Sequence, residues 1–193
     1  MPASSTDTPA RLLGISGSLR RASNCTAVLR ALPALLDGRA SLDVMTLHDV
    51  PPYNADLEGE ALPEGVRRLR QAITEADALV ICSPEYNYSI PGVLKNAIDW
   101  ASRPSFASPL KGKPALIVTA SPGLFGGVRA QAQIRDLLAA TLARPVARQH
   151  VAIPAVDKKI VDGRIADEPT ALLLGAALDD LLAELALVNA GRP

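Results

Sequence analysis

The chain contains few cysteines and few histidines, and this excludes several kinds of site. Its 193 residues include two cysteines, Cys25 and Cys82, and two histidines, His48 and His150. Two cysteines cannot form a disulfide framework or a four-thiolate metal site, and neither histidine has partners at ligand spacing. We therefore expect no bound metal, histidines that are structural or solvent-facing, and cysteines that pack inside the protein.

An excess of charge of one sign and a long hydrophobic run are also lacking. Lysine plus arginine total 20, as do aspartate plus glutamate, so the formal net charge is zero. A general nucleic-acid binder needs a cationic surface, and a membrane helix needs about 20 apolar residues in succession. We therefore expect neither nucleic acid nor membrane as a partner, and a cytoplasmic location.

The first nine residues are small and polar and include two prolines. They lack the basic start and apolar stretch of a secretory signal. We expect residues 1–9 to form a disordered tail and residues 10–193 to form a single domain.

What the chain does have is an alternation of short apolar runs with amphipathic segments. The apolar runs predict five strands, at residues 11–16, 42–47, 77–82, 114–120 and 146–153. Apolar residues at helical spacing predict helices at residues 24–36, 64–75, 91–101, 128–142 and 171–188. This alternation requires right-handed crossovers and a parallel sheet with helices on both faces. We expect a flavodoxin-like α/β sandwich of three layers with strand order 2-1-3-4-5, whose ligand lies beyond the carboxyl ends of the strands.

The loop after the first strand has the composition of a phosphate-binding loop. Residues 14–24 read Gly-Ile-Ser-Gly-Ser-Leu-Arg-Arg-Ala-Ser-Asn. Glycine allows close approach of the backbone, hydroxyl groups and helix N-terminal N–H groups donate hydrogen bonds, and arginine neutralises charge. The loop lacks the Gly-Lys-Ser/Thr ending of a P-loop and the third glycine of the dinucleotide fingerprint. The alternative is an ordinary polar helix cap, which accounts for one of these residues but not for the whole run.

Two further loops are expected at the same sheet edge. Residues 83–92 follow the third strand and contain two of the three tyrosines in the chain. Residues 121–127 follow the fourth strand and contain three glycines. Backbone amides beside aromatic surface suit a flat heteroaromatic ring. The alternative for the first loop is a rigid turn whose tyrosines pack, and a glycine-rich turn alone is weak support for a site.

Four segments together resemble one known family. They are residues 17–20 (Gly-Ser-Leu-Arg), 84–87 (Pro-Glu-Tyr-Asn), 91–100 (Pro-Gly-Val-Leu-Lys-Asn-Ala-Ile-Asp-Trp) and 121–127 (Ser-Pro-Gly-Leu-Phe-Gly-Gly). In this order they resemble the NADPH-dependent FMN reductases, a flavodoxin-like family that includes quinone, chromate and azo-dye reductases. The resemblance runs from about residue 12 to at least residue 151 and covers most of the chain.

The resemblance implies non-covalent FMN, NADPH or NADH as electron donor, and a homodimer or homotetramer. It places the phosphate on Ser18, Arg20, Ser23 and neighbouring amides. The full set of expected cofactor-binding residues is Ser16, Ser18, Arg20, Ser23, Asn24, Cys25, Pro84, Glu85, Tyr86, Asn87, Ser121, Gly123 and Gly126. Family members commonly have asparagine at the position of Cys25, so the role of Asn24 or Cys25 at the phosphate stays open. Suggested subunit-contact residues are Tyr53, Tyr88, Lys95 and Trp100.

The implied reaction is a two-electron transfer from NAD(P)H through the flavin to a small acceptor such as a quinone, a flavin, chromate or an azo compound. The flavin carries this chemistry, so no side chain is assigned as catalytic. Amides of residues 85–87 would stabilise the reduced ring. Arg103 and Arg129 are candidates for the NADPH 2′-phosphate. The alternatives are a flavodoxin-type electron carrier, a non-catalytic FMN-binding protein and a classical NAD-dependent dehydrogenase.

Overall fold

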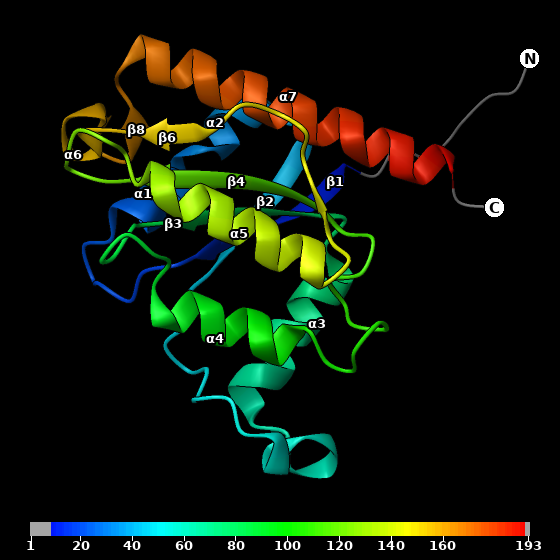
Figure 1. Ribbon diagram of the computed structural model, residues 1–193. Coiled ribbons are helices and arrows are strands. Elements are labelled where there is room, and N and C mark those ends of the chain that lie inside the picture. The colour runs from blue at the N-terminus through cyan, green and yellow to red at the C-terminus, as the bar shows by residue number, and fades with distance from the viewer. Residues whose placement is uncertain (1–8, 192–193) are drawn as a thin grey trace, which may run out of the picture.

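The fold is organised around a parallel sheet. The computed structural model describes residues 9–191, so of the expected tail at residues 1–9 only Pro9 is among the described residues. The strands are β1 (Ala10–Ser16), β2 (Ala40–Met45), β3 (Ala78–Ser83), β4 (Pro114–Ala120), β5 (Arg144–Pro145) and β6 (Val151–Ile153). Their order is β2-β1-β3-β4-β5, with β6 also paired to β4 (Figure 1). The flavodoxin-like order is therefore confirmed.

Helices cover both faces of the sheet, as expected. Helices α1 (Asn24–Ala31), α2 (Pro33–Leu36) and α7 (Glu168–Ala190) pack on one face, and α3 (Glu64–Glu75), α4 (Gly92–Ala101) and α5 (Val128–Ala140) pack on the other (Figure 1). Successive strand residues point to opposite faces. Leu12 and Val80 therefore face α1 and α7, whereas Leu13 and Leu79 face the other three helices. Strands β3 and β4 are buried over their whole length.

Three parts of the fold differ from the expected elements. The expected helix at residues 24–36 is divided at Pro33, which has no N–H to donate inside a helix. Of the expected fifth strand at residues 146–153, only β6 is a strand, because the chain pairs with β4 first through β5, leaves it after Val146 and returns at Val151. Residues 156–165 form the short helix α6 (Val156–Lys159) and an antiparallel pair, β7 (Ile160–Val161) and β8 (Arg164–Ile165), which the apolar pattern does not indicate.

The long connection after β2 is held against α4. It contains two 3₁₀ turns, at Ala55–Leu57 and Gly59–Ala61. Asn96 accepts a hydrogen bond from the backbone N–H of Tyr53 over 2.7 Å and donates to the carbonyl of Pro51 over 2.9 Å. The indole N–H of Trp100 donates to the same carbonyl over 2.8 Å. Asn96 and Trp100, both in the 91–100 segment, thus hold the connection after β2 in place and are not ligand-binding residues.

Two features are absent from the described residues. None of the helices within residues 9–191 is both long and apolar enough to cross a membrane. In the same range, no three histidine, cysteine, aspartate or glutamate side chains are grouped so that they could hold a metal ion.

Candidate cofactor site

The loops that follow β1, β3 and β4 enclose one small cavity at the carboxyl edge of the sheet. Because these strands are parallel, their carboxyl ends meet at this edge. The cavity has a volume of about 100 Å³. It is lined by Ser18, Arg20, Ser23, Asn24, Cys25, Pro84, Glu85, Tyr86, Ala120, Ser121 and Pro122. The three loops singled out in the sequence therefore meet around a common space.

The start of α1 supplies hydrogen-bond donors to this cavity. Ser23 is the N-cap residue, and its hydroxyl oxygen accepts the N–H of Thr26 over 3.1 Å. The hydroxyl oxygen of Ser18 accepts the N–H of Arg20 over 3.3 Å. Each hydroxyl group therefore keeps its own hydrogen for a ligand. No residue in the described range accepts the N–H groups of Asn24 and Cys25, which lie in the first helical turn where such groups bind anions.

Arg20 and Arg21 are the unpaired cations of this loop. Both side chains are exposed, and neither forms an ion pair with any residue in the described range. Arg20 lines the cavity and Arg21 does not. Arg103 and Arg129 differ, because they pair with Glu58 and Glu85 at 3.6 Å and 3.0 Å. Arg20 is therefore the positive charge most available to an anion in the cavity.

The segment after β3 forms a tight turn. Tyr86 and Ser89 exchange two backbone hydrogen bonds of 2.9 Å, and Asn87 and Tyr88 between them have φ values of +50° and +66°. The N–H of Tyr86 is therefore used within the turn. The N–H groups of Glu85 and Asn87 have no acceptor among residues 9–191. Three backbone amides were expected to stabilise a flavin ring. Those of Glu85 and Asn87 are thus available to a ligand, and that of Tyr86 is not.

Most of the expected cofactor-binding residues lie around the cavity, and four do not. Asn87 is exposed at the tip of the turn, and Gly123 donates its N–H to the hydroxyl of Ser121 over 3.0 Å. Gly126 packs against the end of β6, where an added Cβ would be 2.8 Å from backbone atoms of Ile153. Ser16 is fully buried beneath the first loop, and its hydroxyl lies 2.8 Å from that of Thr26. These residues shape the loops from outside the lining.

Two lining residues were not selected from the sequence. Ala120 and Pro122 flank Ser121 and contact the cavity together with it. Their position at the end of the fourth apolar run and just beyond it was the signal that could have indicated them.

The two cysteines have different positions. Cys25 lines the cavity, so it and Asn24 both remain candidates for the phosphate contact. Cys82 is fully buried on β3, and burial raises its pKa well above the usual value, with a smaller contribution from the neighbouring Cys25. Cys82 is therefore a neutral thiol that packs in the core, as its place in an apolar run predicts.

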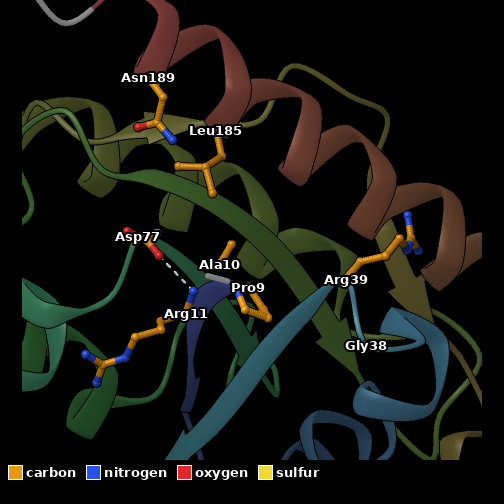
Figure 2. A pocket seen from close by; sticks show the side chains of 8 residues that line it. All are labelled: Pro9, Ala10, Arg11, Gly38, Arg39, Asp77, Leu185 and Asn189. Atoms are coloured by element: carbon orange, nitrogen blue, oxygen red, sulfur yellow. Dashed lines mark hydrogen bonds between the residues drawn. The ribbon is translucent and has the colours of Figure 1, made fainter. Parts of the chain in front are cut away.

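A larger hollow lies at the opposite edge of the sheet. It has a volume of about 660 Å³ and lies between the amino ends of β1 and β2 and the end of α7 (Figure 2). Figure 2 shows the backbone N–H of Arg11 bonded to Asp77, at 2.7 Å. Both arginines that line this hollow form ion pairs, Arg11 with Glu75 and Arg39 with Asp179. None of the three conspicuous loops reaches it, so its size does not make it the cofactor site.

Comparison with known proteins identifies the family. A model of the NADPH-dependent FMN reductases matches residues 10–158. A protein of Pseudomonas aeruginosa named NAD(P)H-dependent FMN reductase is 41% identical over 172 residues, or 89% of this chain and 92% of the relative. A quinone reductase of Escherichia coli K12 is 44% identical over 131 residues, or 66% of this chain and 69% of the relative.

A solved structure agrees with these matches. The flavoenzyme FerB, an NAD(P)H:(acceptor) oxidoreductase of Paracoccus denitrificans, superimposes with a TM-score of 0.82 at 35% identity. The match covers 92% of this chain and 98% of FerB. Family model, curated relatives and structure thus agree with the resemblance carried by the four sequence segments. The chain belongs to the NADPH-dependent FMN reductase family.

Proposed function

We propose that the protein is an FMN-containing oxidoreductase that transfers two electrons from NADPH or NADH to a small acceptor, with a quinone as the favoured class. The overall reaction is NAD(P)H + H⁺ + quinone → NAD(P)⁺ + hydroquinone. The observation that carries this proposal is the meeting of the three loops around one cavity with unpaired donors. Family membership and relatives named as quinone reductases support the same reaction.

The residues of the cavity fit the phosphate end of FMN. The hydroxyl groups of Ser18 and Ser23 and the N–H groups of Asn24 and Cys25 are free to donate, and Arg20 supplies an unpaired positive charge. A phosphate monoester is bound by such donors at a helix N-terminus without a metal ion. A cavity of about 100 Å³ would hold the phosphate end of FMN and not the whole molecule.

When bound, FMN supplies the two-electron chemistry, which the protein itself does not provide. The protein orients the cofactor through the loops after β3 and β4. The free N–H groups of Glu85 and Asn87 can stabilise negative charge nearby. No side chain is needed as a nucleophile.

An apolar groove beside the cavity suits a flat acceptor. It has a volume of about 340 Å³ and shares Arg20 and Tyr86 with the cofactor cavity. Leu19 and Tyr86 are 37% and 47% exposed, which leaves apolar surface for a ligand to cover. A quinone ring can pack against this apolar surface.

The test is the visible spectrum of the purified protein and its response to NADPH without oxygen. The proposal predicts flavin bands that bleach with NADPH or NADH and return when a quinone is added. Bands that persist with both donors would favour an electron carrier or a non-catalytic FMN-binding protein. A colourless protein that takes up no added FMN would contradict the proposal.

We further propose that this single-domain protein is a cytoplasmic homodimer or homotetramer, as family membership suggests. The structure corrects one suggested subunit-contact residue, because Trp100 is fully buried within its own chain. Tyr88 is 69% exposed and Lys95 is exposed on α4, so both are accessible to a second subunit. Light scattering coupled to size-exclusion chromatography tests this, and a monomer at micromolar concentration would contradict it.

A further inference from the structure

Arg129, in the first turn of α5, connects two of the loops that line the cofactor cavity. Its backbone N–H donates to one carboxylate oxygen of Glu85 over 2.9 Å, and its guanidinium group donates to the other over 3.0 Å. The Glu85 side chain is 12% exposed and that of Arg129 is 39% exposed. Partly buried charges are screened less by salt than surface charges are. The pair therefore fixes the position of Glu85 relative to α5.

The guanidinium group of Arg129 also lies against two aromatic rings. Its central carbon is 4.3 Å from the ring centre of Tyr88 and 5.0 Å from that of Phe125. Tyr88 belongs to the turn after β3, and Phe125 belongs to the loop after β4. The two rings are 69% and 63% exposed, so core packing does not hold them. Their attraction to the cation links the two loops through one side chain.

Gln133 holds the same turn one helical turn further along α5. Its amide oxygen accepts the hydroxyl of Ser89 over 2.6 Å, and its amide nitrogen donates to the carbonyl of Tyr88 over 3.1 Å. Asn87 and Tyr88 have positive φ values, which cost conformational energy in residues other than glycine. Contacts from outside the turn are therefore needed to keep this conformation.

From these contacts we infer that Arg129 and Gln133 are positioning residues that hold the two walls of the cofactor cavity. Pro84, Glu85 and Tyr86 line one side, and Ser121 and Pro122 line the other. Arg129 and Gln133 do not line the cavity and act through the loops. The carboxylate of Glu85 is engaged by Arg129, so Glu85 offers the ligand its backbone N–H. The inference rests on the proposed function for the identity of the ligand and on the structure alone for the contacts.

The experiment compares Arg129→Ala with the wild-type protein by two measurements. The first is the Kd of the apoprotein for FMN, from quenching of flavin fluorescence. The second is amide hydrogen exchange of residues 84–90 and 121–127 without FMN. Residues within one network couple strongly enough that we expect the Kd to rise about tenfold. Exchange of the Tyr86 and Ser89 amides should become faster.

Arg135→Ala is the matched control. Arg135 lies on the same helix, but its guanidinium group donates to the carbonyl of Val146 over 3.1 Å, and no hydrogen bond joins it to either loop within residues 9–191. This variant should keep both the FMN affinity and the exchange rates of the wild-type loops. Gln133→Ala should speed exchange in residues 84–90 and leave residues 121–127 unchanged, because within residues 9–191 the Gln133 side chain bonds only to Tyr88 and Ser89 of the turn after β3. Arg129→Lys keeps the positive charge but lacks the planar guanidinium group. Its affinity for FMN should therefore lie between those of Arg129→Ala and the wild-type protein.

The outcomes separate the positioning role from the proposed function. Unchanged Kd and unchanged exchange in Arg129→Ala would overturn the inference. A weaker Kd with unchanged exchange would also overturn it, because Arg129 would then act on the ligand directly. Faster exchange in Arg129→Ala, together with wild-type protein that binds no FMN, would support the positioning role and overturn the proposed function.

Discussion

Arg20 and Arg129 are both arginines beside the cofactor cavity, yet their surroundings assign them different roles. Arg129 is bound to Glu85 and lies against two rings, so its charge is already used within the protein. Arg20 is exposed, lines the cavity and has no acidic partner in the described part of the chain. Of the two, Arg20 is therefore the residue whose charge is free for the cofactor phosphate.

Replacing Arg20 by alanine should weaken FMN binding without destabilising the protein. A hydrogen bond to a charged group contributes about 1.5–3 kcal/mol, so the Kd should rise about tenfold to a hundredfold. The thermal midpoint of the apoprotein should stay the same, because the Arg20 side chain has no partner within residues 9–191 to lose. Fluorescence titration and thermal unfolding monitored by circular dichroism measure the two effects. Arg21→Ala is the control and should change the Kd less, and an Arg20→Ala variant with wild-type affinity would contradict the assignment.

The sequence indicated Arg20 but not the partner of Arg129, and the reason is distance along the chain. The Gly-Ser-Leu-Arg run is local, so its chemistry can be read from neighbouring residues. Glu85 and Arg129 are 44 residues apart, and their contact depends on how the start of α5 lies against the loop after β3. Ser16 shows the same limit, because only the structure shows its hydroxyl turned toward Thr26 beneath the loop.

At the scale of elements, two helical glycines have opposite surroundings. Gly65 lies in the first turn of α3, where an added Cβ would be 1.9 Å from the backbone carbonyl oxygen of Asp49. Gly175 lies within α7, and an added Cβ there would have no atom within 4 Å. The first glycine permits a close approach of α3 to the preceding loop, whereas the second has no steric role.

We therefore expect Gly65→Ala and Gly175→Ala to change stability in opposite directions. Alanine favours a helix by about 1 kcal/mol relative to glycine, but overpacking a close contact costs about 1–3 kcal/mol. A clash with backbone is hard to relieve, so Gly65→Ala should lower the free energy of unfolding, and Gly175→Ala should raise it by about 0.4–1 kcal/mol. Urea unfolding measures both. A stabilised Gly65→Ala variant would show that α3 does not approach Asp49 this closely.

The start of α7 provides a pH-dependent contribution to stability. Asp167 is the N-cap, and its carboxylate accepts the N–H and the hydroxyl of Thr170 and lies 3.5 Å from the Lys159 ammonium. The hydroxyl of Thr170 is the largest cause of a lowered pKa for Asp167, followed in the same direction by its N–H and by Lys159.

A lowered pKa means that the ionised carboxylate stabilises the folded state. Asp167→Ala should therefore lower the stability equally at pH 7 and pH 5. The difference from wild type should shrink as the pH falls through about 3.9, where the carboxyl group of the unfolded chain is half protonated. Urea unfolding at pH 7, 5 and 3.5 measures this. A difference that grows as the pH falls would contradict the sign of the pKa shift.

Elements with a strong apolar pattern were predictable, and interrupted ones were not. Residues 64–75 and 114–120 have the bounds expected from the sequence, because their faces are continuous. The expected strand at residues 146–153 is interrupted because residues 147–150 leave the sheet. Arg148 instead pairs with Asp180 of α7 at 2.7 Å. The short β7–β8 pair contains only two residues in each strand, which is too few to produce a periodic signal.

At the scale of the whole molecule, strand order and loop chemistry together determine where the function lies. The parallel order brings three loops from distant parts of the sequence to one edge of the sheet. The hollow of about 660 Å³ is at the other edge and lacks these loops. The sequence predicted that these loops meet at one edge, because each of them followed a predicted strand. The sequence could not separate the nine expected residues that line the cavity from the four that do not, because the lining depends on turn geometry such as the Tyr86–Ser89 bonds.

The central claim is that this cavity binds FMN through its phosphate. The most direct measurement compares the affinities of the apoprotein for FMN and for riboflavin, which lacks the phosphate, by fluorescence titration. Several charge-assisted hydrogen bonds of about 1.5–3 kcal/mol each should make FMN bind at least about 100-fold more tightly. Arg20→Ala should reduce this ratio. Equal affinities for FMN and riboflavin, or no binding of either, would contradict the claim.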